Sequence, residues 1–346
     1  MMISNYLESQ EFLDAREQYL RLNESFGERM IFHVGTGAGL YSELGSMLEC
    51  MLYCYTHKIQ FVLYADDANF SNSGWTDFFE PFCTQSHSIL NKWANYRYKD
   101  HFRWKGIPLP NLLLRRWILP YLLKRTEHVT WLTQDLFDKF VSSDFKKVSF
   151  DWETLGVKNG VVGRDFAKLR QLALRYNKKT KEEIEKRISS LNLTEHYVSI
   201  QIRGGDKSEE FDKLIDADYC LECIDRSGVE INSLFVFTDN YLNVERLKEK
   251  RPQWNIYTLT REDERGYYNA DFNKQSWDFR KDNLLKLFSI VEICINSDLH
   301  FGCAEACVNG FIRSAKKPEQ YVEIKNDGKY IKKGLRTELK RLFSKK

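Results

Sequence analysis

The stretch VSIQIRGGDK, from Val198 to Lys207, decides the fold of the second half of the chain. Its alternating apolar residues predict a buried strand that ends at two glycines, Gly204 and Gly205. Arg203 lies at this junction, where its planar guanidinium can donate several hydrogen bonds to a phosphorylated ligand. The same pattern is also typical of a strand that ends in a turn with solvated charges.

The rest of the second half alternates between strands and helices. Apolar runs predict strands at 233–240, 254–259 and 297–302, and amphipathic spacing predicts helices at 218–226, 241–250 and 281–296, with a last helix starting near Cys303. The strand at 233–240 ends in the polar run Thr238, Asp239 and Asn240. Alternation of this kind is typical of an α/β fold with a parallel sheet.

The first half begins with the same kind of unit. A strand at 30–34 leads into a glycine turn with Gly35, Gly37 and Gly39, and the spacing predicts a helix at 40–58, a strand at 60–67 and helical pieces near 112–123 and 130–140. Ligands of open α/β sheets bind beyond the carboxyl ends of the strands. We therefore expect the glycine turn and the polar strand ends of the second half to mark sites.

Four regions are expected along the chain. They are an N-terminal α/β domain over 1–160, a bridge over 161–192 formed by a charged helix at 164–191, a C-terminal Rossmann-like domain over 193–325, and a basic tail over 326–346. The tail is amphipathic, and two interpretations of it stay open. It is either a solvated terminal helix or a segment that docks weakly on an anionic membrane surface.

Composition excludes several classes of protein. The chain has 346 residues, of which 42% are hydrophobic and 29% charged, as in globular proteins, and its net charge of +3 does not indicate a nucleic-acid partner. No apolar run reaches membrane-spanning length and no signal-peptide pattern is present, so we expect a cytoplasmic protein with reduced thiols in its eight cysteines. The pairs Cys220, Cys223 and Cys303, Cys307 suggest a zinc site, but helical spacing favours Cys220 and Cys223 as core residues.

Six stretches occur in an order that is typical of one enzyme family. They are GTGAGLYSELGSMLE (35–49), GWTDFFEPFC (74–83), VTWLTQDLFDKFV (129–141), VSIQIRGGDK (198–207), LFVFTDN (234–240) and SDLHFGCAEAC (297–307). Together they resemble the fucosyltransferases of the α1,6 and nodulation type over roughly residues 30–313. The resemblance implies a GT-B-like fold, with two Rossmann-type α/β domains facing a cleft. It also implies an inverting transfer of fucose from GDP-fucose to a glycan acceptor, without a metal ion or other cofactor.

The resemblance also implies a set of donor-binding residues. Arg203 matches the phosphate-binding arginine of the family, and Asp239 matches an acidic position expected near the ribose or guanine. Asp206 and Lys207 match residues expected to order the loop and contact the donor. The full donor-binding set is Gln201, Arg203, Gly204, Gly205, Lys207, Thr238, Asp239, Cys303, Ala304 and Glu305.

The acceptor side and the catalytic base are assigned in the same way. The resemblance places Trp75, Trp131 and Gln134 on the acceptor side, together with the glycine turn. An inverting transfer needs a group that takes the proton of the acceptor hydroxyl, and a carboxylate within hydrogen-bond reach is the simplest choice. The candidates for catalytic work are Glu210, Glu209 and Asp206.

This chain departs from the family pattern at three positions. Gln201 replaces a histidine, Gly204 replaces a second arginine, and Glu305 lies in a turn where the family has a serine. Another nucleotide sugar as donor, or a non-catalytic glycan- or nucleotide-binding protein on the same scaffold, therefore stays open. An NAD(P)-dependent oxidoreductase is a further alternative, because the glycine turn at 35–39 follows a strand and opens a helix, although the acidic Asp66 stands about 30 residues beyond it rather than about 20.

Overall fold

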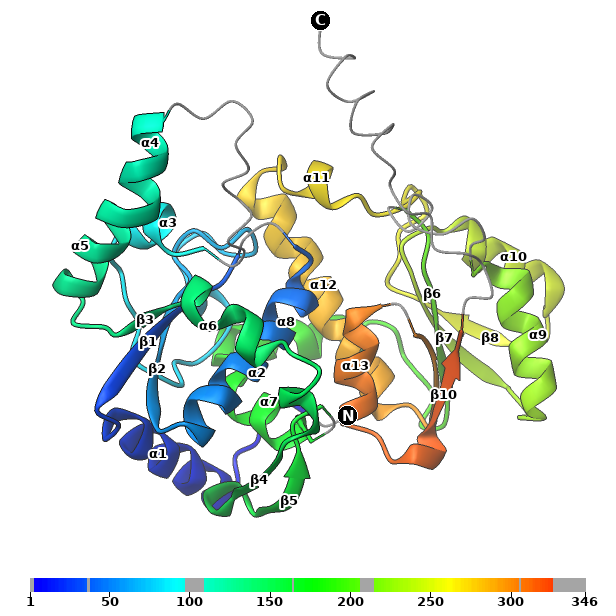
Figure 1. The fold of residues 1–346 in the computed structure, drawn as a ribbon. Coiled ribbons are helices and arrows are strands. Elements are labelled where there is room, and N and C mark those ends of the chain that lie inside the picture. The colour runs from blue at the N-terminus through cyan, green and yellow to red at the C-terminus, as the bar shows by residue number, and fades with distance from the viewer. Residues whose placement is uncertain are drawn as a thin grey trace, which may run out of the picture. The chain divides into compact units, whose positions relative to one another are not determined.

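The computed structural model describes residues 3–35, 38–96, 109–163, 165–205, 215–304 and 306–325. The chain divides into two compact units (Figure 1). Unit 1 comprises Met1–Glu185 and Ser276–Leu285, and unit 2 comprises Lys186–Gln275 and Lys286–Lys346. Each unit contains a parallel sheet and helices, which confirms the predicted α/β class. The cleft that the resemblance implies concerns the placement of the two units and stays a prediction.

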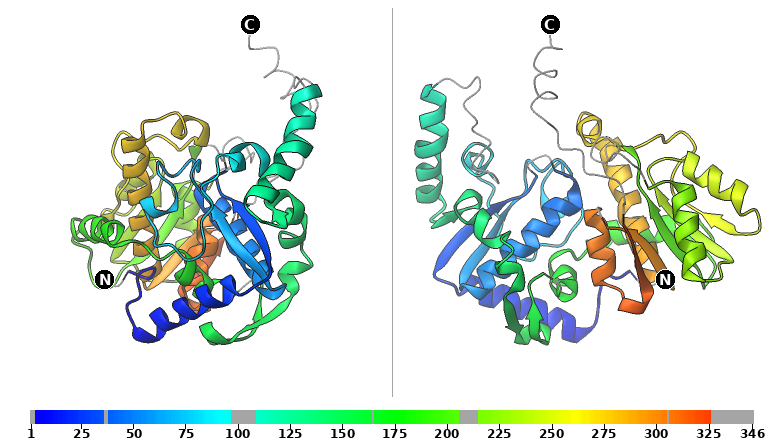
Figure 2. Two further views of the ribbon diagram at one scale, coloured as in Figure 1. Left: turned by 90° about the vertical axis from the view of Figure 1, so that its left-hand side faces the viewer. Right: turned by 45° about the vertical axis from the view of Figure 1, so that its right-hand side comes forward.

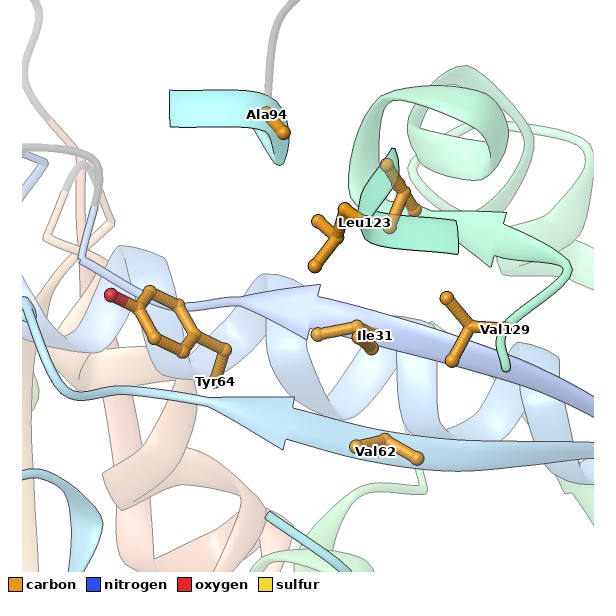
Figure 3. Packing of buried hydrophobic residues seen from close by; sticks show 7 residues of the cluster. Ile31, Val62, Tyr64, Ala94, Leu123 and Val129 are labelled. Carbon is orange, nitrogen blue, oxygen red and sulfur yellow. The ribbon is translucent and has the colours of Figure 1, made fainter. Parts of the chain in front are cut away.

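Unit 1 is built on a three-stranded parallel sheet in the order β2-β1-β3. Its strands are β1 (Glu28–His33), β2 (Ile59–Tyr64) and β3 (Trp131–Leu132), and β1 and β2 lie side by side in both views of Figure 2. Side chains alternate along β1, so Ile31 lies on one face and Phe32 on the other. Ile31 packs in a buried cluster with Val62 and Leu123 (Figure 3), which ties the sheet to the helix that carries Leu123.

The remaining elements of unit 1 are mostly helical. The helices are α1 (Gln10–Glu24), α2 (Leu40–Thr56), α3 (Leu90–Ala94), α4 (Leu109–Leu113), the π-helical segment η3 (Leu114–Ile118), α5 (Leu119–Thr126), α6 (Thr133–Phe140), α7 (Ala167–Ala173) and α8 (Lys178–Ser189), whose last turn belongs to unit 2. An antiparallel pair joins β4 (Ser149–Trp152) to β5 (Val157–Val161). Short 3-10 turns lie at Trp75–Asp77, Phe145–Lys147 and Glu153–Leu155. Helix α2 forms as predicted, because its residues are apolar enough to be buried along most of its length.

The prediction of one charged helix over 164–191 is wrong, because the structure has two helices, α7 and α8, with a short non-helical stretch between them. Leu174 and Tyr176 in this stretch are buried, and the ring of Tyr176 stacks on Phe79 at 5.6 Å. Asn177 then caps α8, since its Oδ1 accepts a hydrogen bond from the Thr180 backbone N–H (2.9 Å). The helix predicted over 130–140 also differs, because its first residues form strand β3 beside β1.

Unit 2 is built on a five-stranded parallel sheet in the order β10-β9-β6-β7-β8. Its strands are β6 (Val198–Ile202), β7 (Ser233–Thr238), β8 (Asn255–Tyr257), β9 (Leu299–Cys303) and β10 (Tyr321–Ile324). Its helices are α9 (Ala217–Ser227), α10 (Leu242–Lys250), α11 (Asn269–Phe272), α12 (Trp277–Asn296) and α13 (Cys307–Ser314), and a 3-10 turn lies at Pro318–Gln320. The first turns of α12 belong to unit 1.

The strand order of unit 2 defines a topological switch point. The chain leaves β6 toward β7 and β8, and then returns to the opposite side of β6 to form β9 and β10. The carboxyl ends of β6 and β9 therefore flank the place where the winding reverses, which is where open α/β sheets bind ligands. The sequence analysis missed the edge strand β10. It also placed the start of the last helix near Cys303, which is the last residue of β9, whereas α13 begins at Cys307.

The cysteines belong mainly to the cores. All eight carry free thiols and six of them are buried, among them Cys220 and Cys303, while Cys307 is exposed. Among the described residues, no group of three or more His, Cys, Asp or Glu side chains could hold a metal ion. Within those same residues, no helix combines the length and the apolar character needed to cross a membrane.

Candidate functional site

Arg203, Gly204 and Gly205 lie directly after β6, the central strand of the unit 2 sheet. The strand is buried along its whole length, because apolar residues alternate with the small or amide side chains of Ser199 and Gln201. The three residues after it are partly exposed. The turn thus marks the point where the chain leaves the core at the switch point of the sheet.

Asp239, which follows β7, holds this turn in place. Its Oδ1 accepts a hydrogen bond from the Gly204 N–H (2.8 Å), and its Oδ2 accepts one from the Tyr267 N–H (3.1 Å). Its backbone oxygen accepts a third from the Gly266 N–H (2.7 Å). Burial raises the pKa of Asp239, while the Gly204 N–H and the Arg203 guanidinium act in the opposite direction. Both carboxylate oxygens are therefore used to join three segments of the edge.

Gly205 is required by the geometry of the turn. Its φ is +53°, in the left-handed region, and a Cβ at this position would lie 2.2 Å from the carbonyl oxygen of Tyr267. At Gly204 the nearest atom to an added Cβ would be Asp239 Oδ1 at 3.4 Å. The backbone thus passes close to the loop at Gly205, and Gly204 leaves room for a side chain.

Arg203 and the start of α13 supply positive charge at the switch point. The guanidinium carbon of Arg203 lies 5.8 Å from the ring centroid of Tyr267, a cation–π distance. Helix α13 begins at Cys307, after a short turn from the carboxyl end of β9. The N-terminus of a helix carries partial positive charge and backbone N–H groups, so it attracts anions. An anionic ligand is therefore favoured at this edge.

A chain of buried polar side chains runs behind the turn. Gln201 Oε1 accepts a hydrogen bond from Asn309 Nδ2 (2.5 Å), which also donates to the Cys303 carbonyl oxygen (2.6 Å). Asn309 Oδ1 lies 3.1 Å from His300 Nε2, and His300 Nδ1 lies 2.8 Å from Ser199 Oγ. The chain therefore crosses from β6 to β9 and α13, the elements on the two sides of the switch point.

The Cys303 carbonyl fixes the direction of every bond in this chain, because a carbonyl can only accept. Asn309 must point its NH2 group toward Cys303 and Gln201, so its Oδ1 faces His300, which carries its proton on Nε2. Burial lowers the pKa of His300 to about 3, so the ring stays neutral near neutral pH. Gln201 turns its oxygen toward Asn309, which leaves its two N–H donors for another group.

The remaining predicted donor residues have different positions. Thr238 is buried, and its Oγ1 accepts hydrogen bonds from the Asn240 N–H (3.2 Å) and from Asn243 Nδ2 (3.3 Å). The Cys303 side chain is buried, while Ala304 is exposed in the turn before α13. Several predicted residues lie outside the described part of the chain, namely Gly37, Asp206, Lys207, Glu209, Glu210 and Glu305.

The residues predicted on the acceptor side lie in unit 1, and two of them are core residues. Trp75 is buried, stacks on Phe79 at 4.6 Å, and donates its indole N–H to the Glu80 carbonyl (3.2 Å). Gln134 is buried and donates to the Ala94 carbonyl (2.9 Å). Trp131 is partly exposed. The indole of Trp75 and the amide of Gln134 therefore support the fold rather than offer a surface to a ligand.

Sequence reasoning missed a polar cluster at the carboxyl edge of the unit 1 sheet. His33 ends β1, and its Nε2 lies 2.7 Å from Asp67 Oδ1. Its Nδ1 donates to the Asn95 backbone oxygen (2.5 Å), and its backbone N–H donates to Thr133 Oγ1 (2.8 Å). In the sequence, His33 lies within an apolar strand pattern, which is typical of a histidine packed in the core. No sequence pattern links His33 to Asp67. Gly35 starts the next turn, where a Cβ would lie 2.3 Å from Ala68 Cα.

No protein-family model and no curated protein matches the chain. Among solved structures, the chain is similar to NodZ α-1,6-fucosyltransferase soaked with GDP-fucose, at 11% identity and a TM-score of 0.49, over 84% of this chain and 93% of that one. It is also similar to POFUT1 in complex with GDP, at 12% identity and a TM-score of 0.44, over 87% of this chain and 98% of that one. A third similar structure is a variant of Arabidopsis thaliana FUT1 in complex with GDP, at 9% identity and a TM-score of 0.48, over 90% of this chain and 78% of that one. Likenesses at such identities and TM-scores do not assign the chain to a family.

Proposed function

We propose that this protein is an inverting, metal-independent glycosyltransferase that transfers fucose from GDP-fucose to a glycan acceptor. The observation that carries the proposal is the position of Arg203 and the glycine turn, at the carboxyl end of β6 and at the switch point of the unit 2 sheet. Such a position suits a nucleotide diphosphate. The choice of GDP-fucose among nucleotide sugars rests on the sequence resemblance of the motif series.

In this proposal, Arg203 and the N-terminus of α13 bind the donor diphosphate. Negative charge grows on the leaving GDP as its bond to the anomeric carbon breaks, so these groups stabilise the transition state more than the bound substrate. The acceptor oxygen forms the new bond from the opposite face, which inverts the anomeric carbon. Its proton passes to a carboxylate, for which we propose Glu210 or Glu209, both outside the described residues.

Calorimetric titration of the full chain with GDP, UDP, CMP, dTDP and NAD, with and without EDTA, tests the donor. We expect binding of GDP alone, unchanged by EDTA. Arg203→Ala should weaken GDP binding by about ten- to a hundredfold, because it removes charge-assisted hydrogen bonds to phosphate. Arg246→Ala is the matched control, since Arg246 is partly exposed on α10 and pairs with Asp218 (3.1 Å).

Turnover is measured next, as the release of GDP from GDP-fucose. Preferential binding of UDP or dTDP would be consistent with a glycosyltransferase but would reject GDP-fucose as the donor. GDP binding without any turnover would favour the non-catalytic binding protein. Binding of NAD alone, or of none of the nucleotides, would reject the proposal.

A further inference from the structure

Helices α4 and α5, with η3 between them, form one helical stretch, and α5 carries apolar residues on both an inner and an outer face. On the inner face, Leu123 belongs to the core cluster that contains Ile31 (Figure 3), and Leu119 packs against that cluster. On the outer face, six apolar side chains are 40–66% exposed, namely Leu113, Leu114, Trp117, Ile118, Tyr121 and Leu122. A surface helix in water normally carries polar residues on its outer face. This face therefore fits surroundings that are less polar than water.

The same helical stretch is basic. Between Leu109 and Thr126 the sequence contains no Asp or Glu, and its charged residues are Arg115, Arg116, Lys124 and Arg125. Lys124 pairs with Asp135 of α6 (2.8 Å). The wider sequence over 92–125 contains nine Lys or Arg and one acidic residue. In the described part of the chain, Arg115, Arg116 and Arg125 lie on the same helical stretch as the exposed apolar side chains, which makes an anionic partner the complementary one.

Aromatic rings and arginines alternate on this surface. Trp117 is 66% exposed, with the Arg116 guanidinium carbon 6.0 Å from its ring centroid. The guanidinium carbon of Arg115 lies 4.8 Å from the ring centroid of Trp93, an exposed residue of α3. Trp and Tyr rings favour the level of lipid headgroups, and Arg side chains reach from there to phosphate.

We propose that α4, η3 and α5 form an interfacial helix that docks the protein on an anionic membrane surface. The apolar side chains enter the boundary between headgroups and acyl chains, and the basic residues contact anionic headgroups. In both views of Figure 2, α4 extends beyond the strands of unit 1, so this end of the helix protrudes from that unit. A second copy of the chain is a poorer occupant, because two copies of this basic surface would repel each other. The inference does not depend on the proposed function.

Vesicle co-sedimentation of the full chain tests this inference. Vesicles of phosphatidylcholine alone are compared with vesicles that also contain roughly 30% phosphatidylserine, at low and at high salt. We expect binding to the anionic vesicles that weakens with salt. The combined variant Trp117→Ser, Ile118→Ser and Tyr121→Ser should lower the partition coefficient at least about tenfold, because it removes the inserted side chains.

Two control variants accompany this measurement. Leu242→Ser combined with Phe279→Ser changes exposed apolar residues elsewhere, on α10 and α12, and should leave vesicle binding unchanged. Arg116→Gln combined with Arg125→Gln should weaken binding to anionic vesicles by about tenfold and flatten its salt dependence. All substituted residues are exposed, and the melting temperature of each variant checks that it folds.

Three outcomes would overturn the proposal. The first is wild-type protein that sediments with neither kind of vesicle. The second is full vesicle binding by the Trp117, Ile118 and Tyr121 variant, which would move the contact to another part of the chain. The third is a wild-type dimer that this variant converts to a monomer while vesicle binding is absent, which would make the surface an interface between copies.

Discussion

Gly204 and Gly205 stand next to each other in one turn, yet the structure requires glycine only at the second. At Gly205 the positive φ and the Tyr267 carbonyl exclude a side chain. At Gly204 an added Cβ would have a contact of 3.4 Å with Asp239 Oδ1, and a small shift accommodates it. Lack of space therefore does not explain why Gly204 stands where the resembling family has an arginine.

The first prediction separates these two glycines by stability. Gly205→Ala should lower the free energy of unfolding by roughly 1–3 kcal/mol, because the turn must accommodate a strained φ and a close carbonyl. Gly204→Ala should change it by less than about 1 kcal/mol. Urea unfolding of both variants measures the difference. Equal stability of the two variants would contradict the geometry of the turn.

The second prediction concerns the missing arginine. Gly204→Arg should strengthen GDP binding by about tenfold, since it adds a second charged fork beside Arg203. Gly204→Gln is the control for the added bulk without charge, and it should give a much smaller gain. Calorimetric titration with GDP measures both. Weaker binding by Gly204→Arg than by the wild type would argue against a phosphate site at this edge.

The third prediction tests the orientation of the Gln201 amide. In Gln201→Glu one oxygen can still accept from Asn309, while the NH2 group is replaced by a charged oxygen. A diphosphate ligand would meet repulsion instead of a donor, so the GDP dissociation constant should rise at least about tenfold. Gln253→Glu adds the same charge at an exposed position of unit 2 and should leave the GDP dissociation constant unchanged. An unchanged GDP dissociation constant for Gln201→Glu would show that this amide does not contact the ligand.

At the scale of elements, β6, β9 and α13 are joined by polar side chains instead of by apolar packing alone. Ser199, Gln201, His300 and Asn309 are all buried, and each makes hydrogen bonds within the chain of side chains. Burying polar groups costs free energy unless their partners are present. This junction is therefore sensitive to any change of protonation.

The fourth prediction is a loss of stability in acid. Because the folded-state pKa of His300 is about 3 and an unfolded histidine titrates near 6.5, the folded chain binds fewer protons between these values. Stability should therefore fall as pH falls through this window, by up to about 1.4 kcal/mol per pH unit. Asp239, whose pKa is raised, acts in the opposite direction above about pH 4.

Urea unfolding at pH 7, 6, 5 and 4 measures this dependence. His300→Gln can donate to Asn309 and accept from Ser199 without titrating, so its unfolding should depend less on pH than that of the wild type. His196→Gln is the control, since His196 is exposed, and it should keep the wild-type dependence. A steep acid dependence that persists in His300→Gln would assign the effect to other groups.

At the scale of the whole molecule, each sheet has its own switch point. In unit 2 it lies between β6 and β9, and in unit 1 it lies between β1 and β3. Polar residues gather beside both, with Arg203 and Gln201 in one and His33 and Thr133 in the other. The positive charge at the unit 2 edge is the reason we propose this edge, and not that of unit 1, as the diphosphate site.

The fifth prediction is a localised response to GDP in hydrogen exchange. Saturating GDP should slow amide exchange at 198–205 and 300–312, because ligand binding suppresses local opening around its site. Exchange in β1 and β2 should change little. Mass spectrometry of proteolytic peptides resolves these segments. Protection confined to β1 and the start of α2 would place the nucleotide on the unit 1 sheet.

Sequence patterns were sufficient for the local units and insufficient for distant contacts. The α/β class and most strand and helix positions follow from side-chain periodicity, and so does the position of Arg203 at a strand end. The break between α7 and α8 depends on the burial of Tyr176 against Phe79, a tertiary contact that no local pattern contains. The hydrogen bond from the Gly204 N–H to Asp239 and the pairing of His33 with Asp67 join residues that are far apart in the sequence. The core position of Trp75 likewise follows only from the packing around it.

Helix α12 determines when unit 1 can be completed during synthesis. Its first turns complete unit 1, where the Trp277 ring lies 5.9 Å from Phe78 and Arg280 Nη1 donates to the Asn69 carbonyl (2.5 Å). During synthesis these residues leave the ribosome only after β6, β7 and β8 of unit 2 have been made. A nascent chain that ends at Glu185 therefore lacks part of unit 1, and no single uninterrupted gene fragment encodes that unit alone.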